Sequence, residues 1–314
     1  MTHPSLRARE ASSNLTVVIS GASGLIGSAV TRVFEQRGHT VRPLVRRDVR
    51  NANEIAWDPA KSSIDASALE GVDAVINLAG ENLAQRWTES TKHRIRDSRI
   101  NATTTLSRAM ASLARKPRVF LSGSAMGIYG AHRDETVDES SAVGSDFLAS
   151  VCVEWEAATS AASDAGIRVV LLRTGLVLSK DGGVLEKMML PFRLGAGARL
   201  GSGEQWMSWI AIADYVEALA FLIRTESVCG PVNMVAPNPV TNTEFTRILA
   251  RVLRRPALFT VPGFAMSLVF GKMAEDTVLA SQRIRPRKLL EAGFEFTLPT
   301  LEAALRSELT RSTR

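Results

Sequence analysis

The sequence predicts an α/β fold, a doubly wound parallel sheet with a smaller α+β cap toward the C-terminus. Three observations predict it. Short apolar runs alternate with helical patterns from residue 16 onward, these runs are apolar on both faces, and a glycine-rich turn follows the first run. Strands that are apolar on both faces belong to parallel sheets that helices cover on both sides. The crossovers between such strands are right-handed.

The expected elements of the sheet follow in order. Each predicted strand is a short apolar run bounded by turn residues, and each predicted helix carries apolar residues at helical spacing. The strands are expected at 16–20, 40–45, 54–57, 73–80, 118–123 and 168–175. The helices are expected at 26–37, 88–113 and 149–165.

The pattern changes beyond residue 180. Residues 180–203 are rich in glycine and long in loop, which suits a segment that covers a ligand. Helical patterns at 214–224, 241–253 and 263–272 then predict the smaller cap. The expected division is a polar, disordered lead-in at 1–14, a sheet domain at 15–180, and a cap region at 181–314 that threads back onto the sheet.

Composition excludes several classes of protein. A hydrophobic fraction of 45% and a charged fraction of 22% are ordinary for a soluble globular protein. No apolar run reaches the ~18 residues of a membrane span, and residues 1–14 lack the apolar core of a secretory signal. We therefore expect a cytoplasmic protein with no membrane partner. Cys152 and Cys229 lie far apart with no histidine pair nearby, so neither a disulfide framework nor a metal site is expected.

The net charge of +6 does not indicate nucleic-acid binding. Lysines and arginines are scattered among acids and are not interleaved with stacking aromatic residues. The short basic clusters at 46–50 and 283–288 are explained at least as well by a small anionic ligand. No nucleic-acid partner is expected.

The first turn is the strongest site signal. VVISGASGLIGSAV places Gly21, Gly24 and Gly27 after a strand and at the start of a helix. Gly21 permits the tight turn, Gly24 lets a diphosphate approach the backbone, and Gly27 lets helix and strand pack closely. This is the pattern of a Rossmann-type dinucleotide site, although a purely structural turn is the alternative. The other residues of the expected phosphate cradle are Ser23, Leu25 and Ile26.

The residues after the second strand predict the cofactor. An Asp or Glu at that place would bind a 2′-hydroxyl, but TVRPLVRRD puts Arg46 and Arg47 there. Guanidinium suits a 2′-phosphate, so the sequence favours NADP(H) over NAD(H). In the alternative, both arginines are solvated surface charges and Asp48 binds the ribose.

Two further strand ends would face the nicotinamide. NLAG ends one strand with Leu78, Ala79 and Gly80, which are candidates for the wall beside the ribose. SGSAMGIYG follows the next strand and brings hydroxyl groups to the same edge, where they could bind a substrate oxygen and stabilise charge. These hydroxyls belong to Ser122, Ser124 and Tyr129, with helix capping as the alternative role for the serines.

GASGLIG, NLAG, RINATTTL, SGSAMGIYG, LLRTGLVL and WIAIADYVEAL occur in the order of extended short-chain dehydrogenases/reductases, which the chain resembles. NLAGENLAQRWTESTKHRIRDSRI and GPVNMVAPNPVTNTEF resemble its uncharacterised branch of epimerase family proteins, related to nucleotide-sugar epimerases. The tail from VPGFAMSLVFGK onward resembles that branch's C-terminal domain of unassigned function. The resemblance covers roughly residues 15–308 and makes a homodimer one expectation.

The resemblance implies roles for further residues. Asp58 would border the adenine, and Asn101 would hold the active-site helix and a proton-relay water. Ser124 would bind the reacting oxygen, while Thr174 and Gly175 would lie against the nicotinamide. Asp214 matches an aspartate that usually fixes the cap helix and is expected to be structural.

The chain departs from the family at its acid/base pair. Extended members carry Tyr-x-x-x-Lys on the helix after the serine strand, where Tyr moves the proton and Lys lowers its pKa. Here FLASVCVEWE puts Leu148 and Cys152 at those positions, or Phe147 and Val151 in the neighbouring register. The acid/base could instead be Tyr129, a carboxylate on the same helix, or the Cys152 thiol.

Two functions therefore stay open. One is an oxidoreductase or epimerase that uses Ser124 and a displaced acid such as Tyr129 on a small, anionic or nucleotide-sugar-like substrate. The other is an inactive or slow NADP(H)-binding module that senses redox state or binds a partner. The side chains expected to contact an anionic substrate are Arg173, Arg193, Arg199, Trp206 and Arg283.

Overall fold

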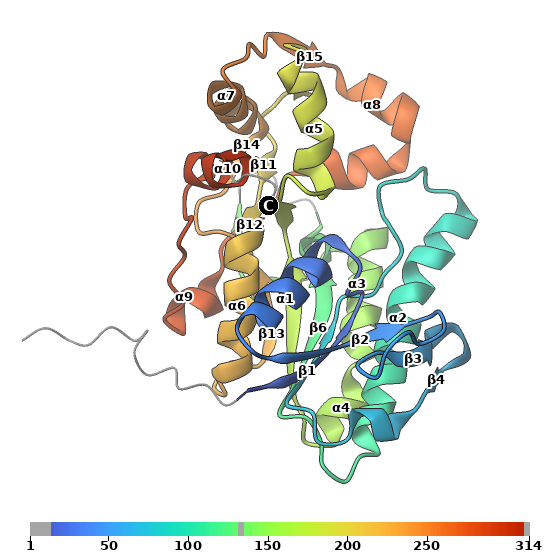
Figure 1. Ribbon diagram of the computed structural model, residues 1–314. Coiled ribbons are helices and arrows are strands. Elements are labelled where there is room, and N and C mark those ends of the chain that lie inside the picture. The colour runs from blue at the N-terminus through green and yellow to red at the C-terminus, as the bar shows by residue number, and fades with distance from the viewer. Residues whose placement is uncertain (1–13, 131–134, 311–314) are drawn as a thin grey trace, which may run out of the picture.

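The computed structural model describes residues 14–130 and 135–310, and it is built around one large sheet (Figure 1). Its eight strands lie in the order β13-β8-β6-β5-β1-β2-β3-β4. All neighbours are parallel except β3 and β4, which are antiparallel. The strands are β1 (Thr16–Ser20), β2 (Thr40–Val45), β3 (Ile55–Asp58), β4 (Ser63–Ile64), β5 (Ala74–Asn77), β6 (Val119–Ala125), β8 (Arg168–Thr174) and β13 (Gly230–Met234). The predicted doubly wound parallel sheet is confirmed.

Helices cover both faces of this sheet because its strands are apolar on both faces (Figure 1). Val17 and Ile19 of β1 pack in one core with α1 (Leu25–Gln36) and α6 (Ile212–Arg224). Val18, between them, points to the other face and packs with α2 (Glu89–Ala111). Each such fully buried aliphatic side chain stabilises the fold by about 1.5–3 kcal/mol.

The predicted helix at 149–165 is two helices, α3 (Phe147–Ala157) and α4 (Ser160–Asp164). Thr159 lies at the break, and its hydroxyl donates to the carbonyl of Glu156. A threonine that bonds the preceding turn competes with the helical backbone pattern, which is why apolar spacing alone did not predict the interruption.

A smaller lobe lies at one end of the sheet and has its own apolar core (Figure 1). Gly182 and Gly183, at its first helix, lie against the side chain of Leu25 at the start of α1. The lobe therefore meets the edge of the sheet where the parallel strands end. Its elements are α5 (Gly183–Arg193), β10 (Ala198–Leu200), β11 (Trp206–Met207), β14 (Val240–Thr241), α7 (Asn242–Leu253), β15 (Phe259–Val261), α8 (Gly263–Phe270) and α10 (Leu301–Thr310).

The chain passes between the two lobes several times. After α5 it returns to the large sheet, because α6 covers one face and β13 forms its edge. β12 (Trp209–Ala211) pairs with β9 (Leu176–Leu178), and β16 (Arg283–Ile284) pairs with β7 (Thr136–Val137). Neither lobe is therefore a continuous piece of chain. The helix at 214–224 was expected in the cap, but as α6 it packs on the large sheet.

A buried carboxylate connects two distant segments of the chain. Asp214 on α6 accepts backbone N–H groups from Thr297 and Leu298, which agrees with its expected structural role.

Across the described ranges no helix is long and apolar enough to cross a membrane. The same residues hold no cluster of three or more His, Cys, Asp or Glu side chains arranged for a metal ion.

Candidate functional site

The turn between β1 and α1 has the geometry of a phosphate cradle. Gly21 has φ +69°, and a Cβ there would lie 2.8 Å from the carbonyl oxygen of Leu78. A Cβ on Gly27 would lie 2.2 Å from the carbonyl oxygen of Gly21. Both positions therefore require glycine, one for its backbone conformation and both for space.

The start of α1 is open to an anion. Its N-cap is Gly24, which offers no side-chain cap, and the first turn carries no acid. The N–H groups of Leu25, Ile26 and Gly27 have no acceptor within the helix, and the helix dipole favours negative charge at this end. Ser23 is exposed in the same turn. A diphosphate would satisfy these donors, so the residues present fit a dinucleotide.

Ser20, which sequence reasoning missed, fixes the wall of this site. Its hydroxyl donates to Asn77 Oδ1 at 2.6 Å and accepts the N–H groups of Leu78 and Ala79 at 3.1 and 3.2 Å. The end of β1 is thereby tied to the NLAG segment that ends β5. Leu78 and Ala79 thus lie beside the glycine turn.

The tie between α2 and α3 is made by Thr103 and not by Asn101. Thr103 Oγ1 accepts Asn77 Nδ2 at 2.8 Å and Trp155 Nε1 at 2.9 Å, and the residue is fully buried. Asn101, expected in this role from the resemblance, is exposed on α2. Two residues along a helix turn the side chain to a different face, which corrects the assignment.

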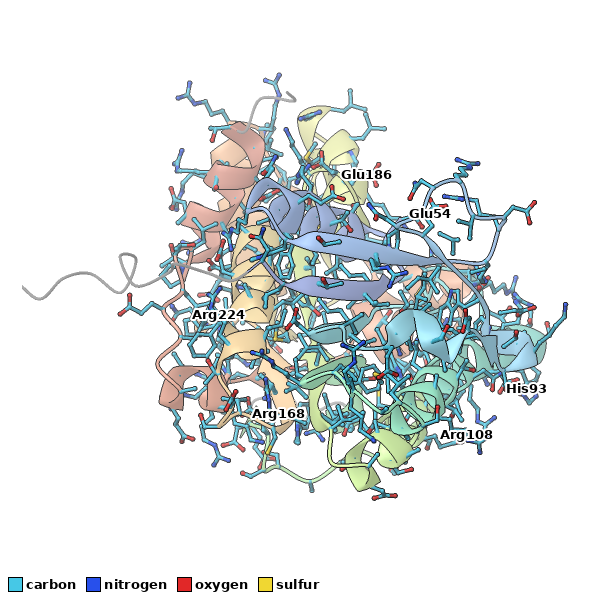
Figure 2. The ribbon with its side chains drawn as sticks, turned by 60° about the horizontal axis from the view of Figure 1, so that its bottom comes forward. Glu54, His93, Arg108, Arg168, Glu186 and Arg224 are labelled. Atoms are coloured by element: carbon cyan, nitrogen blue, oxygen red, sulfur yellow. The ribbon has the colours of Figure 1, made fainter. Side chains whose placement is uncertain are left out.

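The two arginines after β2 differ in their surroundings. Arg47 Nη1 donates to Glu54 Oε2 at 2.8 Å, and its hydrogen bonds lower the pKa of Glu54 to about 2. Figure 2 labels Glu54 on the loop that joins β2 to β3. Arg47 is therefore occupied, whereas Arg46 is exposed and bonds to none of the described residues. Asp58, expected beside the adenine, accepts the N–H of Ala60 and pairs with Lys61.

Ser124 is the first member of a buried polar network. Its hydroxyl donates to Glu156 Oε1 at 2.7 Å. Arg173 holds the same carboxylate through Nε at 2.9 Å and Nη2 at 3.0 Å. Arg173 is only 6% exposed, so it is a structural cation and not, as expected, a free ligand for an anionic substrate.

Tyr129 belongs to the same network. Its hydroxyl accepts Arg173 Nη1 at 3.0 Å and donates to Asn233 Oδ1 at 2.7 Å. Burial raises the pKa of Tyr129, despite the nearby guanidinium. The Tyr129 hydroxyl already donates to one partner and accepts from another, which argues against Tyr129 as the displaced acid.

The remaining cofactor candidates line the ends of the central strands. Ser122 is fully buried within β6. Thr174 shares a hydrogen bond with the hydroxyl of Tyr215 at 2.9 Å. Gly175 is needed for close packing, because a Cβ there would lie 2.7 Å from the carbonyl oxygen of Ser208.

The helix positions of the missing Tyr and Lys are apolar in the structure as well. Leu148 and Cys152 are both buried, and Cys152 Sγ lies 3.8 Å from the carbonyl oxygen of Ala125. Burial raises the pKa of Cys152 to about 12. The thiol therefore stays protonated near neutral pH and is no nucleophile.

Arg99 on α2 brings a cation to this place, and sequence reasoning missed it. Its guanidinium lies 5.2 Å from the Trp155 ring, and a Cβ on Gly80 would lie 3.1 Å from its Cζ. It donates to the carbonyls of Ile95 and Glu81, and burial lowers its pKa. No carboxylate in the described part of the chain pairs with it. The signal available in the sequence was that Arg99 lies four residues before Thr103, a spacing that puts both side chains on the same face of α2.

The other expected substrate cations make no hydrogen bond or ion pair with the Ser124 network among the described residues. Arg193 is exposed at the end of α5, and Arg199 is half-buried on β10. Arg283 lies over the Trp206 ring at 4.2 Å, and both line a cavity of about 480 Å³. Asn233 donates to the backbone carbonyl of Arg285, another lining residue, so the buried network separates this cavity from Ser124.

Comparisons with known proteins identify the family of this chain. Residues 17–236 match the NAD dependent epimerase/dehydratase family, and residues 261–308 match a domain of unknown function, DUF1731. An epimerase family protein of Mycobacterium bovis is 46% identical over 95% of this chain and 99% of its own. One from Bos taurus is 36% identical over 93% of this chain and 99% of its own.

Solved structures give the same result. The human epimerase family protein SDR39U1, crystallised with NADPH, superposes with a TM-score of 0.87 at 32% identity over 95% of this chain and all of that one. A protein crystallised with UDP-glucuronic acid and NAD superposes at 0.75 with 19% identity over 94% of this chain and 97% of that one, which shows the shared fold. The chain is a member of the NAD dependent epimerase/dehydratase family, within the extended short-chain dehydrogenases/reductases.

Proposed function

We propose that this protein is an NADP(H)-dependent oxidoreductase or epimerase that acts on a small anionic or nucleotide-sugar-like substrate. The observation that carries the cofactor assignment is the contrast between Arg46, which is free, and Arg47, which Glu54 occupies. A free guanidinium beside an open helix N-terminus suits a 2′-phosphate joined to a diphosphate. The human relative crystallised with NADPH supports the same assignment.

The residues that would hold the cofactor follow the edge of the sheet. The N–H groups of Leu25, Ile26 and Gly27 would bind the diphosphate, and Arg46 would bind the 2′-phosphate. Leu78, Ala79 and Gly80 would form the wall beside the second ribose. When bound, NADP(H) supplies or accepts the hydride, and this chain must then move the matching proton.

Ser124 and Glu156 form the best-placed proton relay. Because the Ser124 hydroxyl already donates to Glu156, its lone pairs are free to accept a hydrogen bond from a substrate hydroxyl. In the direction of alcohol oxidation, with bound NADP⁺ taking the hydride, the substrate proton would pass to Ser124 Oγ while the serine proton passes to Glu156. Reduction reverses these transfers.

The cofactor assignment is tested by isothermal titration with NADPH and NADH. Arg46→Ala is expected to weaken NADPH binding about tenfold to a hundredfold, the value of a charge-assisted contact, and to leave NADH binding unchanged. Arg47→Ala is the matched control and is expected to leave both affinities within about twofold, since its guanidinium is held by Glu54. Equal losses for both cofactors in Arg46→Ala would refute 2′-phosphate recognition.

A second function is favoured by the apolar side chains at the acid/base positions, Leu148 and Cys152. In this case the protein binds NADP(H) and does not turn over. Stopped-flow oxidation of NADPH against a panel of carbonyl compounds distinguishes the two. An enzyme that uses the relay loses about a hundredfold or more in rate in Ser124→Ala and keeps its NADPH affinity. Binding without oxidation by any acceptor would instead identify the module.

A further inference from the structure

The small lobe carries an unusual concentration of exposed apolar side chains, which we call the apolar end face. Large side chains exposed by 60–85% rarely gather on a soluble protein unless the surface contacts something. The members, with their exposures, are Leu190 (66%), Leu194 (75%), Leu258 (85%), Phe259 (60%), Phe264 (76%) and Leu268 (79%).

These side chains come from α5, β15 and α8 and the residues directly beside them, which lie at the same end of the molecule. β10, which follows α5, pairs with β15, and Arg255 Nε donates to the carbonyl of Arg193. α8 follows β15 directly after Pro262. Leu190 and Leu194 are four residues apart, as are Phe264 and Leu268, so each pair points to one side of its helix. Figure 1 shows α5, β15 and α8 at the end of the molecule opposite α4.

The same part of the chain is positively charged. Residues 245–274 contain five Lys and Arg residues and no Asp or Glu. Arg193, Arg254 and Arg255 are exposed next to the apolar side chains. Three of the nearby acids are paired, Glu302 with Arg251 and both Glu275 and Asp276 with Lys272, while Glu186 is exposed on α5. The apolar end face is therefore bordered by more exposed cations than acids.

The combination of exposed apolar side chains and neighbouring cations distinguishes between the possible binding partners of this face. A second copy docked face to face would bring two predominantly cationic borders together, and like charges across a contact are unfavourable. An anionic lipid surface satisfies both features, because apolar side chains enter the boundary of the bilayer while Lys and Arg bind the headgroups. We propose that the apolar end face docks the protein peripherally on membranes that contain anionic phospholipid.

Such docking revises the expectation of no membrane partner, which rested on the absence of a spanning segment. It does not depend on the proposed function, because the face lies outside the cofactor site. α8 contains the first part of the DUF1731 match, at 261–308, and the proposal gives that segment a physical role.

Vesicle flotation of the full chain tests the proposal, with vesicles of phosphatidylcholine alone or of equal parts phosphatidylcholine and phosphatidylglycerol. The wild type is expected to float with the anionic vesicles and to be released by high salt. Phe264→Ser/Leu268→Ser should reduce the bound fraction about tenfold or more, and Arg193→Gln/Arg254→Gln about fivefold or more, near the value of one or two cations. Val143→Ser/Val153→Ser is the matched control, since both valines are exposed elsewhere.

Circular dichroism melts check that each variant is folded, which is expected because the replaced side chains are exposed. No flotation with anionic vesicles, or equal flotation with neutral ones, would overturn the proposal. A dimer in analytical ultracentrifugation that Phe264→Ser/Leu268→Ser dissociates, without vesicle binding, would assign the face to a second copy instead.

Discussion

At the scale of single residues, the position on α3 where the family carries a lysine holds no cation, but a cation from another helix lies close to it. Cys152 at the lysine position is buried and uncharged near neutral pH. Arg99 reaches the same region from α2, lies over Trp155 and is close to Gly80. Only two of its five N–H donors have partners among the described residues. We expect the free donors to bind the nicotinamide ribose.

This role makes a specific prediction for Arg99→Gln. NADPH affinity should fall about tenfold, whereas affinity for 2′,5′-ADP, which lacks the nicotinamide ribose, should not change. Titration calorimetry with both ligands measures the difference. Arg96→Gln is the control on the same helix, because Arg96 pairs with Glu154 at the surface. Equal losses for both ligands would mean that Arg99 only supports the fold.

Residue roles could be predicted from the sequence only where local geometry dictates them. Gly21 and Gly27 were predictable because a tight turn before a helix leaves no room for Cβ. Tyr129 was not, because its partner Asn233 lies 104 residues away in the sequence. The same holds for Arg173, since no local pattern shows that Glu156 will neutralise it in the interior.

At the scale of elements, the turn between β1 and α1 depends on the contact between its first and last glycines. Gly27→Ala would place a methyl group 2.2 Å from the Gly21 carbonyl oxygen, so backbone must move. We expect a loss of at least about 1–3 kcal/mol in the free energy of unfolding, the usual cost of overpacking, together with weaker NADPH binding. Urea unfolding and titration measure the two effects.

Gly263→Ala is the matched control for this prediction. Its new methyl would meet only Leu279 Cδ1, at an ordinary 3.5 Å. Little change in stability is expected there. A Gly27→Ala protein with wild-type stability and cofactor affinity would show that the turn does not hold the helix as described.

Periodicity predicted six of the eight strands of the large sheet to within a few residues, because burial on both faces leaves continuous apolar runs, and it missed β4 and β13. It did not predict the two-residue strands such as β7 and β16, which are too short to carry a pattern. Nor did it show that α6 would leave the cap and cover the sheet. Amphipathic spacing predicts that a helix buries one face, but it does not predict which surface that face packs against.

At the scale of the whole molecule, Glu139 joins three segments that are distant in the sequence. Its Oε1 accepts the N–H of Asn233 on β13 at 3.0 Å and that of Lys288 on α9 (Arg287–Glu291) at 3.3 Å. Its Oε2 is buried with no donor among the described residues. Burial raises the pKa of Glu139, so the fold favours the protonated form.

This raised pKa gives stability a definite dependence on pH. A carboxyl whose pKa is higher in the folded than in the unfolded state contributes stability that is lost as pH rises through the folded pKa. Glu139→Gln keeps the acceptor and removes the titration. The stability of wild type relative to Glu139→Gln should therefore be greater at about pH 5 than at about pH 7, as measured by urea unfolding. The opposite slope would contradict a desolvated carboxyl.

The position of β13 has a consequence for the synthesis of the protein. β8 ends at Thr174, but its neighbour β13 ends at Met234, about 60 residues later. At about 5–20 residues per second on the ribosome, the nascent chain presents β8 as an open strand edge for roughly 3–12 seconds. An unpaired edge of this kind recruits other strands, so a translation pause before residue 234 should increase aggregation more than one after it.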